Sequence, residues 1–110
     1  MDQTFEEIIN AEKPVLIDFY ADWCGPCQML GPVLKELKDI LGNRINIIKV
    51  NVDNNPEVSS HYRIKGVPTM MLFQESRLLW RQSGVISKAE IVDAIMQKCI
   101  WPELPGQEKI

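Results

Sequence analysis

The feature that most constrains this fold is an apolar segment of strand length at residues 14–21, PVLIDFYA, which contains a single carboxylate, Asp18. Its almost continuous apolar character is typical of a strand that is covered on both faces. From Cys24 onward the apolar residues recur at helical spacing instead, until Gly42 and Asn43 predict the end of a helix. A buried strand followed directly by an amphipathic helix predicts an α/β protein.

Local signals predict three further strands and three further helices. Thr4 and Ser87 each have a glutamate three residues later, the spacing of a capping box, and they predict the starts of two helices. Pro56 directly after Asn55 predicts another helix start, with Asn55 as its N-cap. The predicted elements are a short helix after residue 4, a strand at 14–21, a helix at 24–41, a strand at 45–53, a helix from 56 to about 64, strands at 66–74 and 77–85, and a helix after residue 87.

The order of these elements predicts how the sheet is arranged. Two strand–helix–strand steps predict right-handed crossovers and a parallel core, to which the last two strands add an antiparallel hairpin. The hairpin turn at Glu75 and Ser76 has neither glycine nor asparagine, so its type stays open. We therefore predict a domain at residues 1–99, built on a central mixed sheet of about four strands flanked by helices, and an irregular tail at 100–110.

Charge and hydropathy exclude several functional classes. The chain of 110 residues has a net charge of −3 and no cluster of basic residues, so nucleic acid is not an expected partner. No apolar run approaches the roughly 18–20 residues of a membrane span. The acidic N-terminus lacks the basic start and apolar core of a signal peptide, and we therefore expect a cytoplasmic protein.

Two cysteines three residues apart, in ADWCGPCQ, carry the clearest chemical signal. The predicted strand-to-helix transition places Cys24 at the helix N-terminus, where unpaired N–H groups and the helix dipole favour a thiolate. Cys27 lies one helical turn later, close enough for a disulfide after a small adjustment. Pro26 suits the first turn of a helix, and Gly25 lets another chain approach closely.

A purely structural role for the thiol pair fits less well. A disulfide that closes so short a loop stabilises little, and a structural disulfide is not expected in a reducing compartment. A structural zinc site needs four ligands, and the only other cysteine and histidine are Cys99 and His61. We interpret Cys99 as a small buried apolar residue and His61 as a helix-surface or packing residue. Redox chemistry at Cys24 and Cys27 is therefore the favoured interpretation.

Several further positions match one known pattern. They are the WCGPC string at 23–27, Asp18 six residues before Cys24, Pro32 inside the following helix, Lys49, the GVPT string at 66–69 with Pro68, and Gly84. This combination, from about residue 4 to about residue 98, closely resembles the thioredoxin family. The resemblance implies the thioredoxin fold with a cis-proline at Pro68. The chain departs from the family in lacking its first strand, which leaves residues 45–53 on a sheet edge, and in having Gln28 and Tyr20 where a basic residue and commonly tryptophan occur.

The resemblance also implies roles for individual residues. Cys24 is the nucleophile, Cys27 the resolving thiol, Asp18 the proton acceptor for Cys27, and Lys49 the residue that modulates Asp18. Burial in an apolar strand is expected to raise the pKa of Asp18, and the alternative is that Asp18 only forms a salt bridge with Lys49. The implied substrate-contact surface consists of Trp23, Gly25, Pro26, Gly66, Val67, Pro68, Gly84 and Val85, although ordinary packing is the alternative for Trp23.

Together these observations predict a general protein-disulfide reductase that acts in cytoplasmic redox homeostasis. The resemblance implies no metal and no bound cofactor, with a Cys24–Cys27 disulfide as the redox-active group. It further implies electrons from NADPH through a flavin-containing thioredoxin reductase, disulfide-containing client proteins as partners, and a monomer. Two alternatives stay open: a disulfide oxidase or isomerase of the same fold, and a redox-independent binding module.

Overall fold

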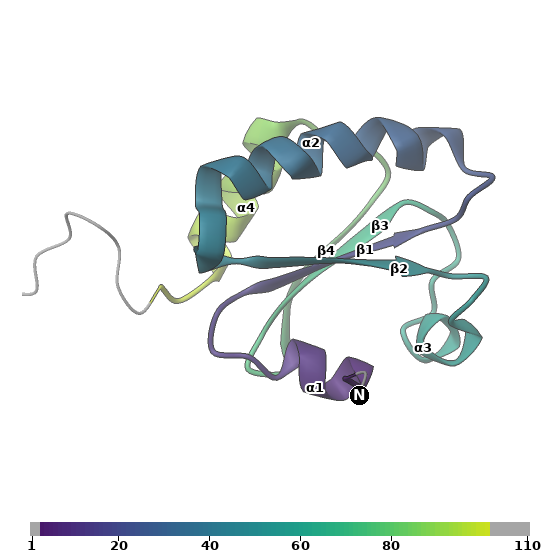
Figure 1. Cartoon of the computed structure of the whole chain (residues 1–110), viewed down its shortest axis with the longest axis horizontal. Helices are drawn as coiled ribbons and strands as arrows, with labels where there is room; N and C mark the ends of the chain where they lie inside the picture. The colour runs from purple at the N-terminus through teal and green to yellow at the C-terminus, as the bar shows by residue number, and fades with distance from the viewer. Residues whose placement is uncertain (1–2, 102–110) are drawn as a thin grey trace, which may run out of the picture.

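A computed structural model describes residues 3–101, which form a four-stranded sheet in the order β2-β1-β3-β4 between two layers of helices (Figure 1). The elements are α1 (Phe5–Ile9), β1 (Val15–Tyr20), α2 (Gly25–Leu41), the 3-10 helix η1 (Gly42–Arg44), β2 (Asn46–Asn51), α3 (Pro56–His61), β3 (Thr69–Gln74), β4 (Arg77–Ser83) and α4 (Lys88–Lys98). This mixed sheet flanked by helices confirms the predicted fold class.

The strand directions confirm only one of the two predicted parallel steps. β1 and β2 are parallel, with Asp18 opposite Lys49, and β3 and β4 form the antiparallel hairpin. The second prediction is wrong, because β3 runs antiparallel to β1, with Thr69 opposite Phe19. The connecting helix α3 has six residues and spans about 9 Å, too short to return along a strand of about 20 Å. The chain therefore re-enters the sheet at the end where β2 leaves it.

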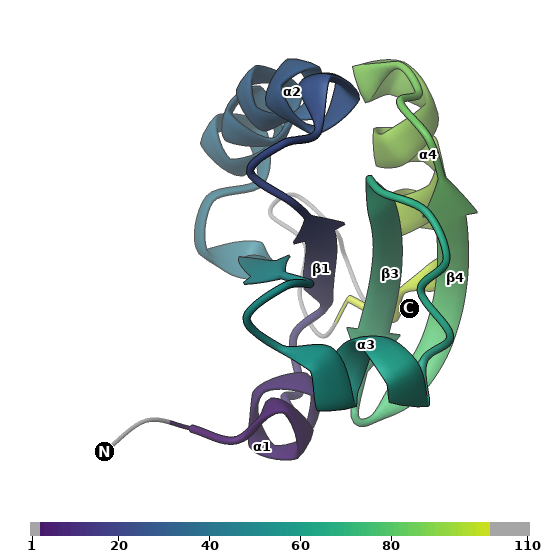
Figure 2. The same ribbon diagram turned by 90° about the vertical axis from the view of Figure 1, so that its right-hand side faces the viewer.

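The two faces of the sheet carry separate apolar cores, as expected for a strand that is buried on both sides. Helices α2 and α4 cover one face and α1 and α3 cover the other (Figure 2). The core under α2 and α4 contains, among others, Leu16, Leu30, Leu37, Met70 and Ile95, and the core under α1 and α3 contains Ile17, Phe19, Val50, Met71 and Phe73. Successive residues of β1 alternate between these cores, which fixes its register.

Helix starts and the hairpin turn are decided by specific hydrogen bonds. Thr4 and Ser87 both form complete capping boxes, as predicted. Asn55 is the N-cap of α3 and is followed by Pro56, as predicted, but its side chain makes no cap bond and instead donates to the carbonyl of Asn51 at 2.9 Å. Glu75 and Ser76 both have positive φ, 51° and 66°, as in a type I′ turn. Their N–H groups donate to the carbonyls of Ala11 and Ile9. These bonds offset the conformational cost of positive φ at two residues that are not glycine.

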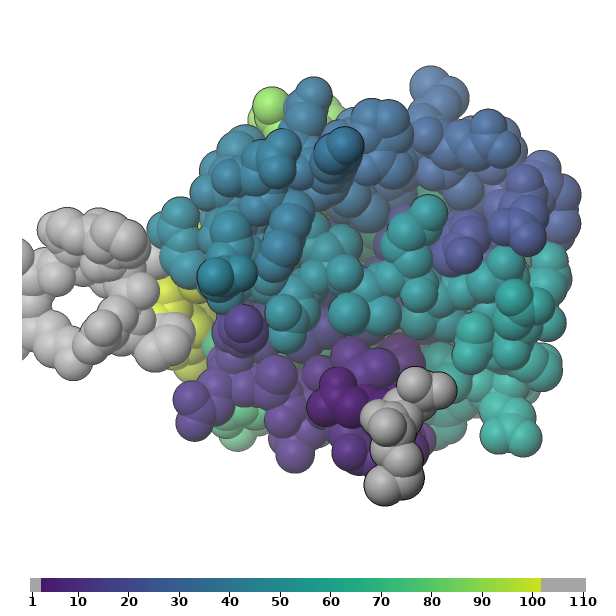
Figure 3. All heavy atoms as spheres, in the orientation of Figure 1, coloured from purple at the N-terminus to yellow at the C-terminus, as the bar shows by residue number. Residues whose placement is uncertain are grey.

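Strand β2 lies at one edge of the sheet, as the missing family strand implies. In the space-filling view its atoms reach the surface between those of α2 and α1 (Figure 3). Ile100, at the start of the predicted tail, is bonded to the side chain of Gln74, and the rest of that tail, residues 102–110, lies outside the described residues. Within residues 3–101, no helix has the length and apolar character needed to cross a membrane.

Candidate redox site

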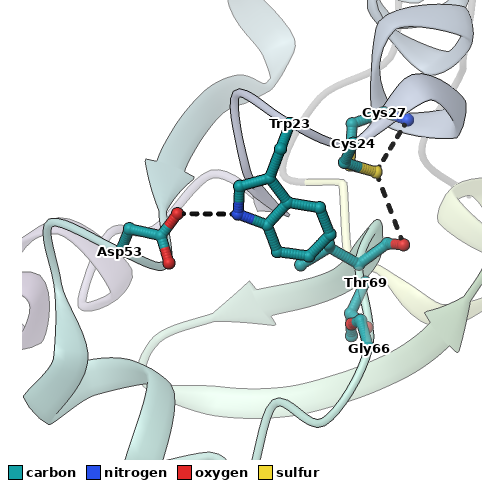
Figure 4. Close-up of a disulfide and its surroundings, with 7 residues drawn as sticks. Trp23, Cys24, Cys27, Asp53, Gly66 and Thr69 are labelled. Carbon is teal, nitrogen blue, oxygen red and sulfur yellow. Dashed lines mark hydrogen bonds between the residues drawn. A yellow bond between two sulfur atoms is a disulfide. The ribbon is translucent and has the colours of Figure 1, made fainter.

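The thiol pair lies where β1 is followed by α2. Cys24 is the N-cap of α2, with extended backbone angles, and Cys27 lies in the first turn of the helix. The two cysteines form a disulfide with Cα atoms 5.3 Å apart. The backbone N–H of Cys27 donates to Sγ of Cys24 at 3.2 Å (Figure 4). In the dithiol form this N–H and the other unpaired N–H groups of the first turn favour negative charge on Cys24.

A loop from the other half of the chain lies against the disulfide. The Val67–Pro68 peptide bond is cis, and the carbonyl oxygen of Val67 lies 3.6 Å from Sγ of Cys24. Two hydrogen bonds hold this loop: the Thr69 hydroxyl donates to the carbonyl of Gly66 at 2.7 Å, and the N–H of Gly84 donates to the carbonyl of Pro68 at 2.9 Å. The structure therefore brings the GVPT string and Gly84 to the thiols.

Comparison with known proteins agrees with this geometry. The thioredoxin family model matches residues 1–97. A thioredoxin of Acidithiobacillus ferridurans is 42% identical over 91 residues, which cover 82% of this chain and 84% of that protein. Thioredoxin 1 of Chlorobaculum tepidum is 39% identical over 98 residues, covering 88% and 97% respectively. The chain belongs to the thioredoxin family. It is therefore a thiol–disulfide oxidoreductase, and its Cys24–Cys27 pair is able to form a disulfide.

The buried carboxylate of this thioredoxin-family chain has an unusual environment. Asp18 is 1% exposed, and neither of its carboxylate oxygens has a hydrogen-bond partner among the described residues. Burial raises the pKa of Asp18 from 3.8 to about 6, against the opposing effect of the positive charge on Lys49. A carboxyl group with such a pKa exchanges a proton close to neutral pH.

Lys49 lies opposite Asp18 in the sheet, but its ammonium group contacts a different side chain. Its Nζ lies 4.3 Å from the centroid of the Tyr20 ring, a cation–π contact. No ion pair joins Lys49 to Asp18 among residues 3–101, so a simple salt bridge does not account for the carboxylate. Tyr20, Lys49 and Cys27 instead line a pocket of about 160 Å³, together with Ala21, Asp22 and Gln28. A pocket of this size has room for water.

Residues of the predicted contact surface differ in how exposed they are. Trp23 is 72% exposed, which excludes ordinary core packing for it. Its indole N–H donates to the carboxylate of Asp53 at 2.9 Å (Figure 4). The remaining predicted surface residues are exposed at Gly25, Pro26, Gly66, Gly84 and Val85, half-buried at Val67 and buried at Pro68. Sequence reasoning missed Asp53, because it lies 30 residues from Trp23 and belongs to no recognisable motif.

The other cysteine and the histidine lie away from this site. Cys99 is buried in the core under α2 and α4, and burial raises the pKa of its thiol to about 11. His61 packs edge-to-face on Tyr62, with ring centroids 4.7 Å apart. Within residues 3–101, no three histidine, cysteine or acidic side chains converge as metal ligands would.

Proposed function

We propose that this chain is a general protein-disulfide reductase. The observation that carries the proposal is the Cys24–Cys27 disulfide at the N-terminus of α2, next to the carbonyl of Val67. In the dithiol form, the Cys24 thiolate attacks a client disulfide, forms a mixed disulfide and releases one client thiolate. Cys27 then attacks Sγ of Cys24 and releases the second client thiolate. The client gains two electrons and two protons, one that leaves Cys27 and one from solvent, and Cys24 and Cys27 become oxidised.

Asp18 is proposed to accept the proton of Cys27 during the second step. Its pKa of about 6 is suited to proton transfer near neutral pH. The pocket beside Cys27 has room for a water that relays the proton, and Lys49 lines the same pocket. The positive charge of Lys49 limits how far the pKa of Asp18 rises, which is the sense in which it modulates the base.

Client proteins are proposed to bind across the cis-proline loop. An extended client segment can pair with the backbone of Val67, as an added strand pairs with a sheet edge. The exposed indole of Trp23 and the exposed side chain of Val85 supply apolar contacts on either side. Backbone pairing gives affinity that does not depend on particular client side chains, which suits many clients rather than one.

The electron source and the compartment are proposed from the resemblance to the thioredoxin family. We propose that NADPH reduces the Cys24–Cys27 disulfide through a flavin-containing thioredoxin reductase, and that the chain works as a monomer in cytoplasmic redox homeostasis. No cofactor is needed within the chain itself, because the two thiols carry the electron pair.

Insulin reduction with added thioredoxin reductase and NADPH tests this proposal. We expect turnover by the wild-type chain and none by Cys24→Ser, and we expect Cys27→Ser to accumulate covalent client adducts. Adducts on Cys24→Ser instead would reverse the two thiol roles. A reduction potential well above that of cytosolic glutathione would favour the oxidase or isomerase. Full cellular activity of the doubly substituted Cys→Ser protein would favour the binding module.

A further inference from the structure

Arg81 joins the edge strand β4 to the segment that leads into the cis-proline loop. It lies opposite Met71 across the β3–β4 ladder. Met71 belongs to the core under α1 and α3, and residues directly opposite each other point to the same face of a sheet. The side chain of Arg81 is therefore on the face that α3 covers.

The guanidinium binds two successive carbonyl groups just after α3. Nη1 of Arg81 donates to the carbonyl of Tyr62 at 2.6 Å, and Nη2 donates to the carbonyl of Arg63 at 3.0 Å. The planar fork of a guanidinium suits two acceptors held side by side, and a lysine ammonium cannot reproduce that geometry. Both bonds are charge-assisted, which strengthens them.

These carbonyls belong to a turn that is unfavourable without additional hydrogen bonds. The last carbonyl groups of a helix have no partner inside the helix, and Tyr62 is the C-cap of α3. Arg63 has φ of 52°, in the left-handed region that is unfavourable for a residue with a side chain. Arg81 therefore acts as a cap supplied by a distant strand, and it stabilises a turn that local sequence does not favour.

This turn is the upstream end of the loop that contacts the disulfide. Residues 64–67 separate Arg63 from Pro68, and the last of them, Val67, places its carbonyl beside Cys24. The downstream end of the loop is held by the bonds to the carbonyls of Gly66 and Pro68. Arg81 thus fixes one end of the loop, and the Thr69 and Gly84 contacts fix the other.

We propose that Arg81 is a positioning residue for client binding, which rests on the proposed function. By binding the turn at Tyr62 and Arg63, it holds the backbone N–H and carbonyl groups of Val67 where an extended client segment can pair with them. It touches neither thiol, so it acts on the affinity for protein clients and leaves the reactivity of Cys24 unchanged.

The test compares a protein disulfide with a small one. For Arg81→Gln we expect the KM for insulin to rise about tenfold, the loss expected for one charge-assisted hydrogen bond, with kcat unchanged. The rate with 5,5′-dithiobis(2-nitrobenzoic acid), an aromatic disulfide that has no peptide backbone, should stay at the wild-type value. Arg77→Gln is the matched control, since Arg77 is at the far end of β4 and its side chain donates no hydrogen bond to residues 3–101; it should behave as wild type.

Arg81→Lys provides a second test in case Arg81→Gln does not fold. It keeps the charge, and we expect an intermediate KM together with faster hydrogen exchange at the amides of residues 64–67. An unchanged KM for insulin, or an equal loss of rate with insulin and the aromatic disulfide, overturns the inference. Failure of the wild-type chain to reduce insulin contradicts the proposed function instead, so the two failures are distinguishable.

Discussion

Two buried polar side chains in this sheet, Gln74 and Asp18, differ in their hydrogen bonding. Gln74, at the end of β3 farthest from the cis-proline, is 7% exposed and fully bonded. Its amide N–H groups donate to the carbonyls of Glu12 and Ile100 at 2.8 and 2.6 Å, and its oxygen accepts from the N–H of Ile100 at 2.8 Å. Asp18, nearer the thiols, is even less exposed and has no hydrogen-bond partner among residues 3–101.

The difference separates a polar group that supports the fold from one that is suited to chemistry. A buried polar group with all its hydrogen bonds stabilises one conformation. A buried carboxyl group without them is destabilised when it is charged, and it therefore binds a proton more tightly than in water. Gln74 accordingly stabilises its end of the sheet. At the other end, burial of Asp18 lowers the stability of the fold and raises the pKa of the carboxyl group toward neutrality.

The largest expected effect is on the pH dependence of stability. The pKa of Asp18 is raised from 3.8 to about 6 in the folded state, so the folded protein binds the proton more tightly than the unfolded chain does. Stability from this group therefore increases as pH falls from about 7 to below 4, by up to about 3 kcal/mol. Asp18→Asn should exceed the wild type in free energy of unfolding by about that amount at pH 7, and the gap should close near pH 4.

Urea unfolding of both proteins across this pH range measures the difference directly. Comparing the two proteins cancels the titration of all other groups. A gap that stays constant with pH would contradict the assignment of the raised pKa to Asp18.

The next effect is on the second chemical step. Asp18→Asn removes the proposed proton acceptor of Cys27, and resolution of the mixed disulfide should slow by about a hundredfold, or about 2.7 kcal/mol. The first step, attack by Cys24, should keep its rate. Rapid-quench trapping of the mixed disulfide at pH 7 separates the steps, and equal slowing of both would count against Asp18 as the base.

The smallest effect of the three is expected at the opposite end of the sheet. Gln74→Leu removes three hydrogen bonds and should lower the free energy of unfolding by about 2 kcal/mol, while insulin reduction keeps its rate. Gln74→Glu should lose more, because it keeps an acceptor for the N–H of Ile100 but places a buried carboxylate against the carbonyl oxygens of Glu12 and Ile100. Loss of insulin reduction by Gln74→Leu at unchanged free energy of unfolding would contradict a purely structural role for Gln74.

Local patterns were sufficient for much of this molecule. The apolar run around Asp18 predicted the buried strand, the change of periodicity at Cys24 predicted the helix that places the thiols, and the capping spacing at Thr4 and Ser87 predicted two helix starts. Each of these signals lies within a few residues of the feature that it predicts. The family resemblance then indicated that the segment with Pro68 lies at the same site.

Features that depend on distant contacts could not be predicted in this way. The direction of β3 follows from where the chain re-enters the sheet, and apolar periodicity is the same for both directions. Lys49 contacts the ring of Tyr20 because of sheet geometry. Arg81 and Gln74 acquire their partners only when segments far apart in sequence meet, and nothing adjacent to either residue distinguishes it from an ordinary surface side chain.

The bonds from the Glu75–Ser76 turn to Ala11 and Ile9 have a consequence for how the chain is assembled. They tie the hairpin to the segment before β1, while β1 itself lies between a strand from its own half of the chain and a strand from the other half. The first and second halves are therefore interleaved. A polypeptide cut near α3 would yield two fragments that lack a complete sheet alone and regain the redox centre only by complementing each other.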